Sequence, residues 1–192
     1  AIHDYREREH SRWSDRTAPI VDRLRRTALG DLGRERQALG SLHVLDLHER
    51  GKINPHVDSV RVSREPLAQS PAEMVQYCGD VVSGLSLLSS AVMRLKFTRN
   101  ADSPDAEDAA CFANFAEDQL VVDLLLQRRS LYRLTGPTRY LFKHEILGAD
   151  EATFGGDAVP RGRRISLICR DLPRRKEKLA EPSDGGRQKI EE

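Results

Sequence analysis

Apolar and polar residues alternate through most of the middle of the chain, with the two-residue period of a strand that buries one face. Turn-forming sequences separate these segments, and we expect strands at residues 42–47, 54–59, 81–89, 91–98, 120–126, 130–134, 139–146 and 160–170. About eight short strands with turns between them are typical of a closed double sheet. The pattern therefore predicts a mainly β fold with flanking α-helices, arranged as a double-stranded β-helix, or jelly roll.

Three of these segments carry more specific expectations. Residues 49–52 are expected to turn the chain between the first two strands, and residues 89–90 to form a tight turn between the third and fourth. The dense aliphatic run at residues 120–126 is typical of a strand that is buried on both faces.

The segment from Thr17 to about Leu29 has a helical period instead. Its apolar side chains fall on one stripe, formed by Ile20, Val21, Leu24 and Leu29. Pro19 lies in the first turn and Gly30 ends the pattern, which are the usual boundaries of a helix. We expect this helix to support the outside of the sheet, with Trp13 anchoring its start rather than contacting a substrate.

These elements predict one domain with less ordered segments attached. Residues 1–40 are expected to form a helical support region, and residues 41–173 the jelly-roll core. Within the core, residues 61–76 and 100–116 lack periodicity and are expected to be variable loops. Residues 174–192 are rich in charge and are expected to form a disordered tail.

The net charge and the cysteine content indicate which kinds of partner and which cellular compartment suit this chain. The 192 residues carry a net charge of only +1, so the chain lacks the overall basic excess typical of nucleic-acid binders. Three widely spaced cysteines, Cys78, Cys111 and Cys169, favour free thiols in a reducing compartment. No apolar run approaches the ~20 residues of a membrane span. The first residue is Ala1 rather than Met, so we expect the chain to be trimmed or processed, and no presequence can be read from it.

A histidine and an aspartate lie two residues apart in the second predicted strand. Extended backbone points His56 and Asp58 to the same face. Two imidazoles and one carboxylate form the set that binds non-heme Fe(II) and leaves coordination positions open, and we expect His144 to complete it. Because such a pair is common, an exposed histidine beside a turn aspartate is the alternative. We expect His43 and His48 to be structural or exposed.

The last predicted strand, residues 160–170, supports the metal-site hypothesis. Alternation places Arg164, Ser166 and Arg170 on one face and apolar residues on the other. Two arginines six residues apart stand ~20 Å apart along a strand, and their long side chains can close that gap to about the length of a short dicarboxylic acid. Arginine binds carboxylates through a planar fork. An iron triad with this arginine pair indicates 2-oxoglutarate as a cosubstrate.

The order of these motifs resembles the AlkB family of Fe(II)/2-oxoglutarate dioxygenases, and most closely a mitochondrial member of it. The resemblance covers roughly residues 1–173, and its most similar segments are residues 41–47, 55–59, 84–89, 92–95, 139–140, 144–147 and 160–166. It implies that His56, Asp58 and His144 hold Fe(II). It also implies that Arg164, Tyr132 and Ser166 bind the distal carboxylate of 2-oxoglutarate, and that Arg170 orders its metal end.

Two positions qualify this resemblance. In the bacterial family pattern an asparagine and a tyrosine contact the cosubstrate eleven and nine residues before the first metal histidine, where this chain has Leu45 and Leu47. Those polar contacts are therefore absent. Tyr132 matches a cosubstrate-binding tyrosine by position, with a core aromatic as the alternative.

The resemblance implies an O2-dependent oxidoreductase of the mitochondrial matrix that is linked to programmed necrosis and fatty-acid metabolism. The chain is only 5% aromatic, and the segment before its core resembles a helix rather than the aromatic, basic lid that base-flipping relatives use. This favours a protein substrate. Demethylation of methylated bases in mitochondrial tRNA or other RNA is the alternative, and an inactive jelly-roll scaffold is the second. The sequence does not indicate an oligomeric state.

Overall fold

The computed structural model describes residues 2–30, 41–58, 78–99 and 110–172. The predicted loop at residues 61–76, most of the predicted loop at residues 100–116, and the tail at residues 174–192 lie outside this part of the chain. Within it, no helix is both long and apolar enough to cross a bilayer.

The chain is built mainly from strands. Its strands are β1 (Ile2–His10), β2 (Leu42–His56), β3 (Val82–Leu88), β4 (Ala91–Phe97), β5 (Val121–Leu126), β6 (Leu131–Leu134), β7 (Phe142–Ile146), β8 (Thr153–Phe154), β9 (Asp157–Ala158) and β10 (Arg164–Arg170). Its helices are α1 (Ala18–Leu29) and α3 (Pro137–Tyr140).

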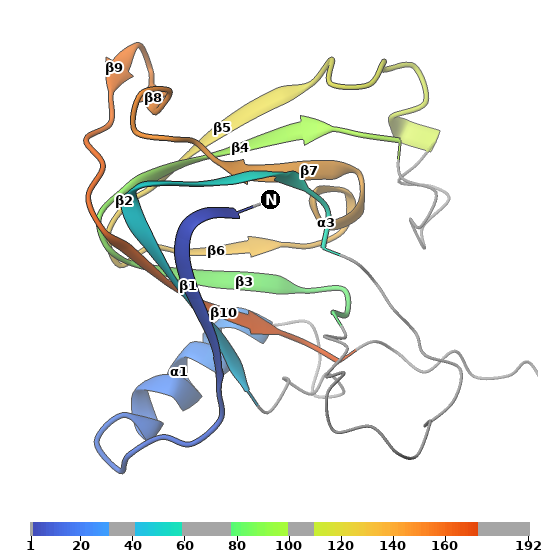
Figure 1. Ribbon diagram of the computed structural model, residues 1–192. Coiled ribbons are helices and arrows are strands. Elements are labelled where there is room, and N and C mark those ends of the chain that lie inside the picture. Colours follow the sequence, from blue (N-terminus) through green and yellow to red (C-terminus); the bar gives the residue numbers. More distant parts are fainter. Residues whose placement is uncertain (1, 31–40, 59–77, 100–109, 173–192) are drawn as a thin grey trace, which may run out of the picture.

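One antiparallel sheet folds over on itself to make two facing layers. The strand order is β5-β4-β7-β2-β10-β3-β6, with β1 also paired to β2. Figure 1 shows β5, β4 and β7 in one layer and β10, β3 and β6 in the other, with β2 passing from the first layer to the second. This nearly closed arrangement confirms the predicted jelly roll.

Strand β2 is longer than the sequence pattern indicated. We expected a turn at residues 49–52, but the backbone continues as a strand for 15 residues. One end of β2 pairs with β10, at Leu47 opposite Arg164, and the other end pairs with β7, at Ile53 opposite Ile146. The charged residues at 48–50 are exposed on this strand, so their polarity reflects solvent contact rather than a turn.

Two further expectations were wrong in detail. Residues 120–126 do not form a strand buried on both faces, because β5 lies at the end of the sheet order and exposes Val121 and Val122 by about half. Residues 137–140 form α3, so β7 begins at Phe142 rather than at residue 139. The expected turn at residues 89–90 is present, and it leads from β3 in one layer to β4 in the other.

The N-terminal segment is only partly helical. Helix α1 confirms the predicted helix, but residues 2–10 form β1, which pairs along β2. Residues 2–10 show no apolar alternation, because β1 is held mainly by backbone pairing with β2 and keeps many of its side chains in solvent.

Helix α1 covers the outer face of the layer formed by β3, β6 and β10. Its buried side chains, Val21, Leu24 and Ala28, pack with Leu42 and Cys169, and Trp13 packs against the same cluster. This confirms that α1 supports the sheet and that Trp13 serves in packing. A separate core lies between the two layers and includes Leu45, Leu47, Ile53, Met93, Phe97, Phe142 and Ile146. The three cysteines are free thiols, also as expected.

The packing of α1 predicts unequal effects along its apolar stripe. Leu24 is 7% exposed whereas Ile20 is 61% exposed. Leu24→Ala leaves a cavity beneath the helix and should lower the free energy of unfolding by about 2–5 kcal/mol. Ile20→Ala should change it by less than about 0.5 kcal/mol. Urea denaturation of both variants tests this, and equal effects would contradict the observed orientation of the helix.

Candidate metal centre

Three side chains from distant segments meet at one end of the jelly roll. Strand β2 ends at His56, which lies directly opposite His144 of β7 in the antiparallel register. Their ring centroids are 4.2 Å apart. Asp58 follows two residues later, and one ligand atom from each of the three residues lies within 4.8 Å of the other two. The structure therefore brings together all three predicted iron ligands.

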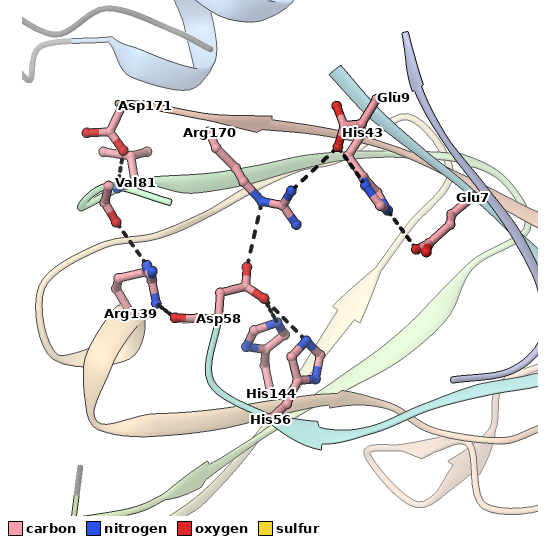
Figure 2. A network of polar contacts seen from close by, with 11 residues as sticks. Glu7, Glu9, His43, His56, Asp58, Val81, Arg139, His144, Arg170 and Asp171 are labelled. Carbon is pink, nitrogen blue, oxygen red and sulfur yellow. Dashed lines mark hydrogen bonds and ion pairs between the residues drawn. The ribbon is translucent and has the colours of Figure 1, made fainter. Parts of the chain in front are cut away.

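The ligand atoms are oriented towards a common point (Figure 2). Asp58 Oδ1 lies 3.4 Å from His56 Nε2 and 4.0 Å from His144 Nε2. His56 Nδ1 lies 2.9 Å from the carbonyl oxygen of Asn54, which can only accept a hydrogen bond. Nδ1 therefore carries the proton, and in the neutral imidazole Nε2 has its lone pair free for a metal.

The electrostatics of the three groups suit a divalent cation. Burial lowers the pKa of His144 to about 4, outweighing the attraction of Asp58. Burial would raise the pKa of Asp58, but the His56 hydrogen bond and the charges of His144 and Arg170 hold it well below its usual range. Burial would lower the pKa of His56, but its bonds to Asp58 and Asn54 raise it. An ionised carboxylate beside a neutral buried imidazole is the donor chemistry that the predicted metal requires.

A chain of charged groups links the triad to the N-terminal strand. Arg170 Nε lies 3.9 Å from Asp58 Oδ2, and Arg170 Nη1 lies 4.0 Å from Glu9 Oε1 on β1. His43 lies between two carboxylates, with Nδ1 2.9 Å from Glu9 Oε1 and Nε2 3.3 Å from Glu7 Oε2. Both ring nitrogens of His43 thus face glutamates, in keeping with the structural role predicted for it. Figure 2 shows this network extending from the triad to β1.

The second predicted cluster surrounds Arg164, which is 1% exposed. Its Nε donates to Ser86 Oγ at 3.0 Å, and its Nη2 lies 3.4 Å from Ser166 Oγ. Among the described residues, no carboxylate oxygen lies within ion-pair distance of this guanidinium. A buried cation whose neighbours are hydroxyl groups has unused capacity to bind an anion, which fits the carboxylate of a ligand.

Tyr132 adjoins this cluster from β6. Burial raises the pKa of Tyr132, although the charge of Arg164 and a hydrogen bond with Ser166 oppose that shift. The phenol therefore remains a hydrogen-bond donor at neutral pH. Tyr132 also packs against the core between the layers, so its two alternative roles are compatible.

The neighbouring strands leave space for these groups. Ser86 of β3 lies opposite Ser166, and Gly84 lies opposite both Ile168 and Tyr132. A Cβ atom on Gly84 would lie 2.4 Å from the Tyr132 ring, so only glycine lets the ring lie across the strand. Gly84 and Ser86 were not among the site residues predicted from the sequence. Their small size at alternate positions of an otherwise apolar strand was the available signal.

Leu45 and Leu47 adjoin the same cluster. Leu45 lies opposite Ser166 and Leu47 lies opposite Arg164, and both leucines are buried in the core. The two polar contacts that the bacterial family pattern would supply are thus replaced by an apolar wall beside the arginine.

The jelly roll brings together a His-Asp-His cluster, which is the ligand set of the non-heme Fe(II) oxygenases. Within that class, the chain is similar to proteins of the AlkB family. It is 43% identical over 173 residues to a mouse protein named alpha-ketoglutarate-dependent dioxygenase alkB homolog 7, mitochondrial, and 42% identical over 173 residues to its bovine namesake. The matches cover 90% of this chain and 62% of each relative's length. No protein-family model matches the chain. The family resemblance found in the sequence is confirmed.

The close contact at Gly84 predicts a specific steric effect. Gly84→Ala should displace the Tyr132 ring and lower the free energy of unfolding by about 1–3 kcal/mol, the usual range for overpacking. Gly162→Ala is the matched control, because its added Cβ meets the Ser89 side chain at an ordinary 3.7 Å. Denaturant titration of Gly84→Ala and Gly162→Ala, with Tyr132→Phe measured alongside, gives the difference in their free energies of unfolding. A Gly84→Ala protein as stable as the control would contradict the observed packing.

Proposed function

We propose that this chain is the catalytic core of a mitochondrial Fe(II)- and 2-oxoglutarate-dependent dioxygenase. The proposal rests chiefly on the convergence of His56, Asp58 and His144, whose ligand atoms lie within 4.8 Å of one another. Similarity to the AlkB family and the names of the two mammalian relatives support it.

Each residue of the site has a distinct role in this proposal. His56, Asp58 and His144 hold the metal, and their arrangement leaves coordination positions for the cosubstrate. When bound, Fe(II) and 2-oxoglutarate supply the reduction of O2 and the oxidation of a substrate C–H bond, with succinate and carbon dioxide as coproducts. The protein contributes ligand placement and a pocket for the organic acid.

The Arg164 cluster binds the distal carboxylate of 2-oxoglutarate. Tyr132 and Ser166 add hydroxyl donors, and Leu45 and Leu47 exclude water from one side. A guanidinium already removed from water binds a carboxylate more strongly than an exposed one does, because the local dielectric is low. Arg170, which lies 3.9 Å from Asp58, orders the metal end of the pocket.

The proposed primary substrate is a protein, hydroxylated in the mitochondrial matrix. Low aromatic content supports this choice, since only 5% of residues are aromatic and base recognition relies on stacking. Strand β1 lies along β2 as a ribbon with mixed charge rather than as an aromatic, basic lid. The links to programmed necrosis and fatty-acid metabolism that the resemblance implies belong to the same proposal.

Loss of the triad should abolish turnover. His56→Ala and Asp58→Ala should each eliminate succinate production coupled to O2 consumption, because the metal loses a ligand. His48→Ala is the matched control, since His48 is exposed on the same strand and lies outside the triad. Succinate and oxygen measurements on purified protein test this. Undiminished turnover in the triad variants would leave the scaffold alternative.

Substitution of the buried arginine should separate cosubstrate binding from metal binding. Arg164→Ala removes a charge-assisted contact worth about 1.5–3 kcal/mol, so the KM for 2-oxoglutarate should rise roughly 10- to 100-fold while Mn(II) still binds. Arg163→Ala is the neighbouring control, because Arg163 is exposed and pairs with Asp46. Unchanged 2-oxoglutarate dependence in Arg164→Ala would refute the assignment.

The substrate class can be tested directly by mass spectrometry. Mitochondrial proteins and RNA are incubated with the wild-type protein or with Asp58→Ala as the inactive control. Added oxygen on a peptide, found only with the wild type, supports the protein substrate. Loss of methyl groups from tRNA or other RNA, together with salt-sensitive RNA binding, would replace that proposal with RNA demethylation.

A further inference from the structure

A second buried arginine, Arg139, lies next to the triad and was not identified from the sequence. It occupies α3 and is 2% exposed. Its Nη1 donates to the carbonyl oxygen of Asp58 at 2.7 Å, and its Nε donates to the carbonyl oxygen of Gly79 at 3.2 Å. Its guanidinium also lies 5.0 Å from the ring centroid of Tyr140. Figure 2 shows Arg139 reaching the Asp58 backbone from the side opposite the histidines.

The Asp58 carbonyl is a functionally sensitive place for such a contact. Strand β2 ends at His56, so Asp58 lies beyond the regular backbone pairing that holds His56 opposite His144. The side chain of an aspartate is short, and the direction of its carboxylate therefore follows the orientation of its backbone. The Arg139 contact supplies a restraint on Asp58 that the sheet does not.

Gly79, the second residue to which Arg139 donates, is itself held by hydrogen bonds. The Gly79 amide donates to the carbonyl oxygen of Asp171 at 3.0 Å, and the Val81 amide donates to Asp171 Oδ1 at 2.8 Å. Tyr140, the residue after Arg139, donates to Asp80 Oδ1 at 2.6 Å. The guanidinium thus ties Asp58 to a segment that is anchored on β10.

The charge of Arg139 is not explained by an ion pair. Within the described residues, no carboxylate lies within ion-pair distance of its guanidinium, and its Nη2 has no hydrogen-bond partner. Burying a guanidinium against backbone carbonyls alone is costly, and a neutral side chain could fill the same space. The feature that only the forked guanidinium provides is simultaneous donation in two directions.

We propose that Arg139 is a positioning residue that aims the Asp58 carboxylate at the metal by holding its backbone carbonyl. The inference rests on the proposed function, because it assumes that Asp58 is a metal ligand. Helix α3 leads directly into β7, so the segment from Arg139 to His144 presents one ligand and clamps the backbone of another. The distance between these two ligands is thereby set within one short, rigid piece of chain.

The test compares metal affinity in two arginine variants. Lysine keeps the charge but replaces the separate Nε and Nη1 donors with a single nitrogen, which does not reproduce the fork that spans the two carbonyls. Arg139→Lys should therefore weaken Co(II) binding to the apoprotein by about 10- to 100-fold, the usual effect of losing an outer-shell contact. Arg161→Lys is the matched control, because Arg161 also donates to two backbone carbonyls, those of Leu147 and Gly51, away from the triad. Titration by absorption spectroscopy gives the Kd, and thermal unfolding gives the loss of stability.

Weaker Co(II) binding in Arg139→Lys than in Arg161→Lys, at a comparable loss of Tm, supports the proposal. Equal Co(II) affinity in Arg139→Lys and the wild type would overturn it. If the Arg139→Lys protein does not fold, a measurement on the wild type tests the proposal instead. Hydrogen exchange at Arg139 Nε should slow when Zn(II) binds, whereas exchange at Arg161 Nε should not. An equal effect of Zn(II) on the exchange rates of the two groups would overturn the proposal. A wild type that binds no Co(II), or binds it equally after His56→Ala, would instead refute the proposed function.

Discussion

The antiparallel pairing of β2 with β7 is the interaction on which the site depends. That register sets His56 opposite His144, although 87 residues of chain separate them in sequence order, and the backbone hydrogen bonds of the pair hold both imidazoles at one end of the fold. The same strand β2 pairs with β10 at its other end, so one continuous strand carries the candidate ligand His56 in one layer and borders the arginine cluster in the other. Slipping β2 by one residue would turn both sets of side chains away from the interior.

Buried positive charge is the second constraint, and the protein meets it in two ways. Arg164 contacts the hydroxyl groups of Ser86 and Ser166 and, among the described residues, no carboxylate lies within ion-pair distance of it. Arg139 instead donates hydrogen bonds to the backbone carbonyl oxygens of Asp58 and Gly79. In both cases the hydrogen bonds that the guanidinium donates offset part of the cost of removing it from water. Leu45 and Leu47, which lie opposite Ser166 and Arg164, add buried apolar surface beside Arg164.

The sequence allowed the candidate ligands to be chosen because their evidence is local. The spacing of His56 and Asp58 follows from the period of extended backbone, and the alternation from Arg164 to Arg170 assigns polar and apolar faces to β10. Helix α1 was predicted for the same reason, because its apolar stripe and its boundary residues are recognised from residues close together in the sequence. Expectations failed where contacts with other strands decide the outcome. Residues 48–50 continue a strand because the parts of β2 on either side of them pair with β1, β10 and β7. Strand β5 exposes Val121 and Val122 because it lies at the edge of the sheet.

By itself, the sequence determined which side chains share a strand face, where the supporting helix lies, and that the chain is similar to the AlkB proteins. Those properties depend on backbone periodicity and on residue identity, which are present before folding. Only the tertiary structure decided that β1 joins the site through Glu9, that glycine at position 84 makes room for Tyr132, and that Arg139 holds the Asp58 backbone. These contacts join residues far apart in the chain, and their geometry follows from strand register and layer packing, which no local pattern encodes.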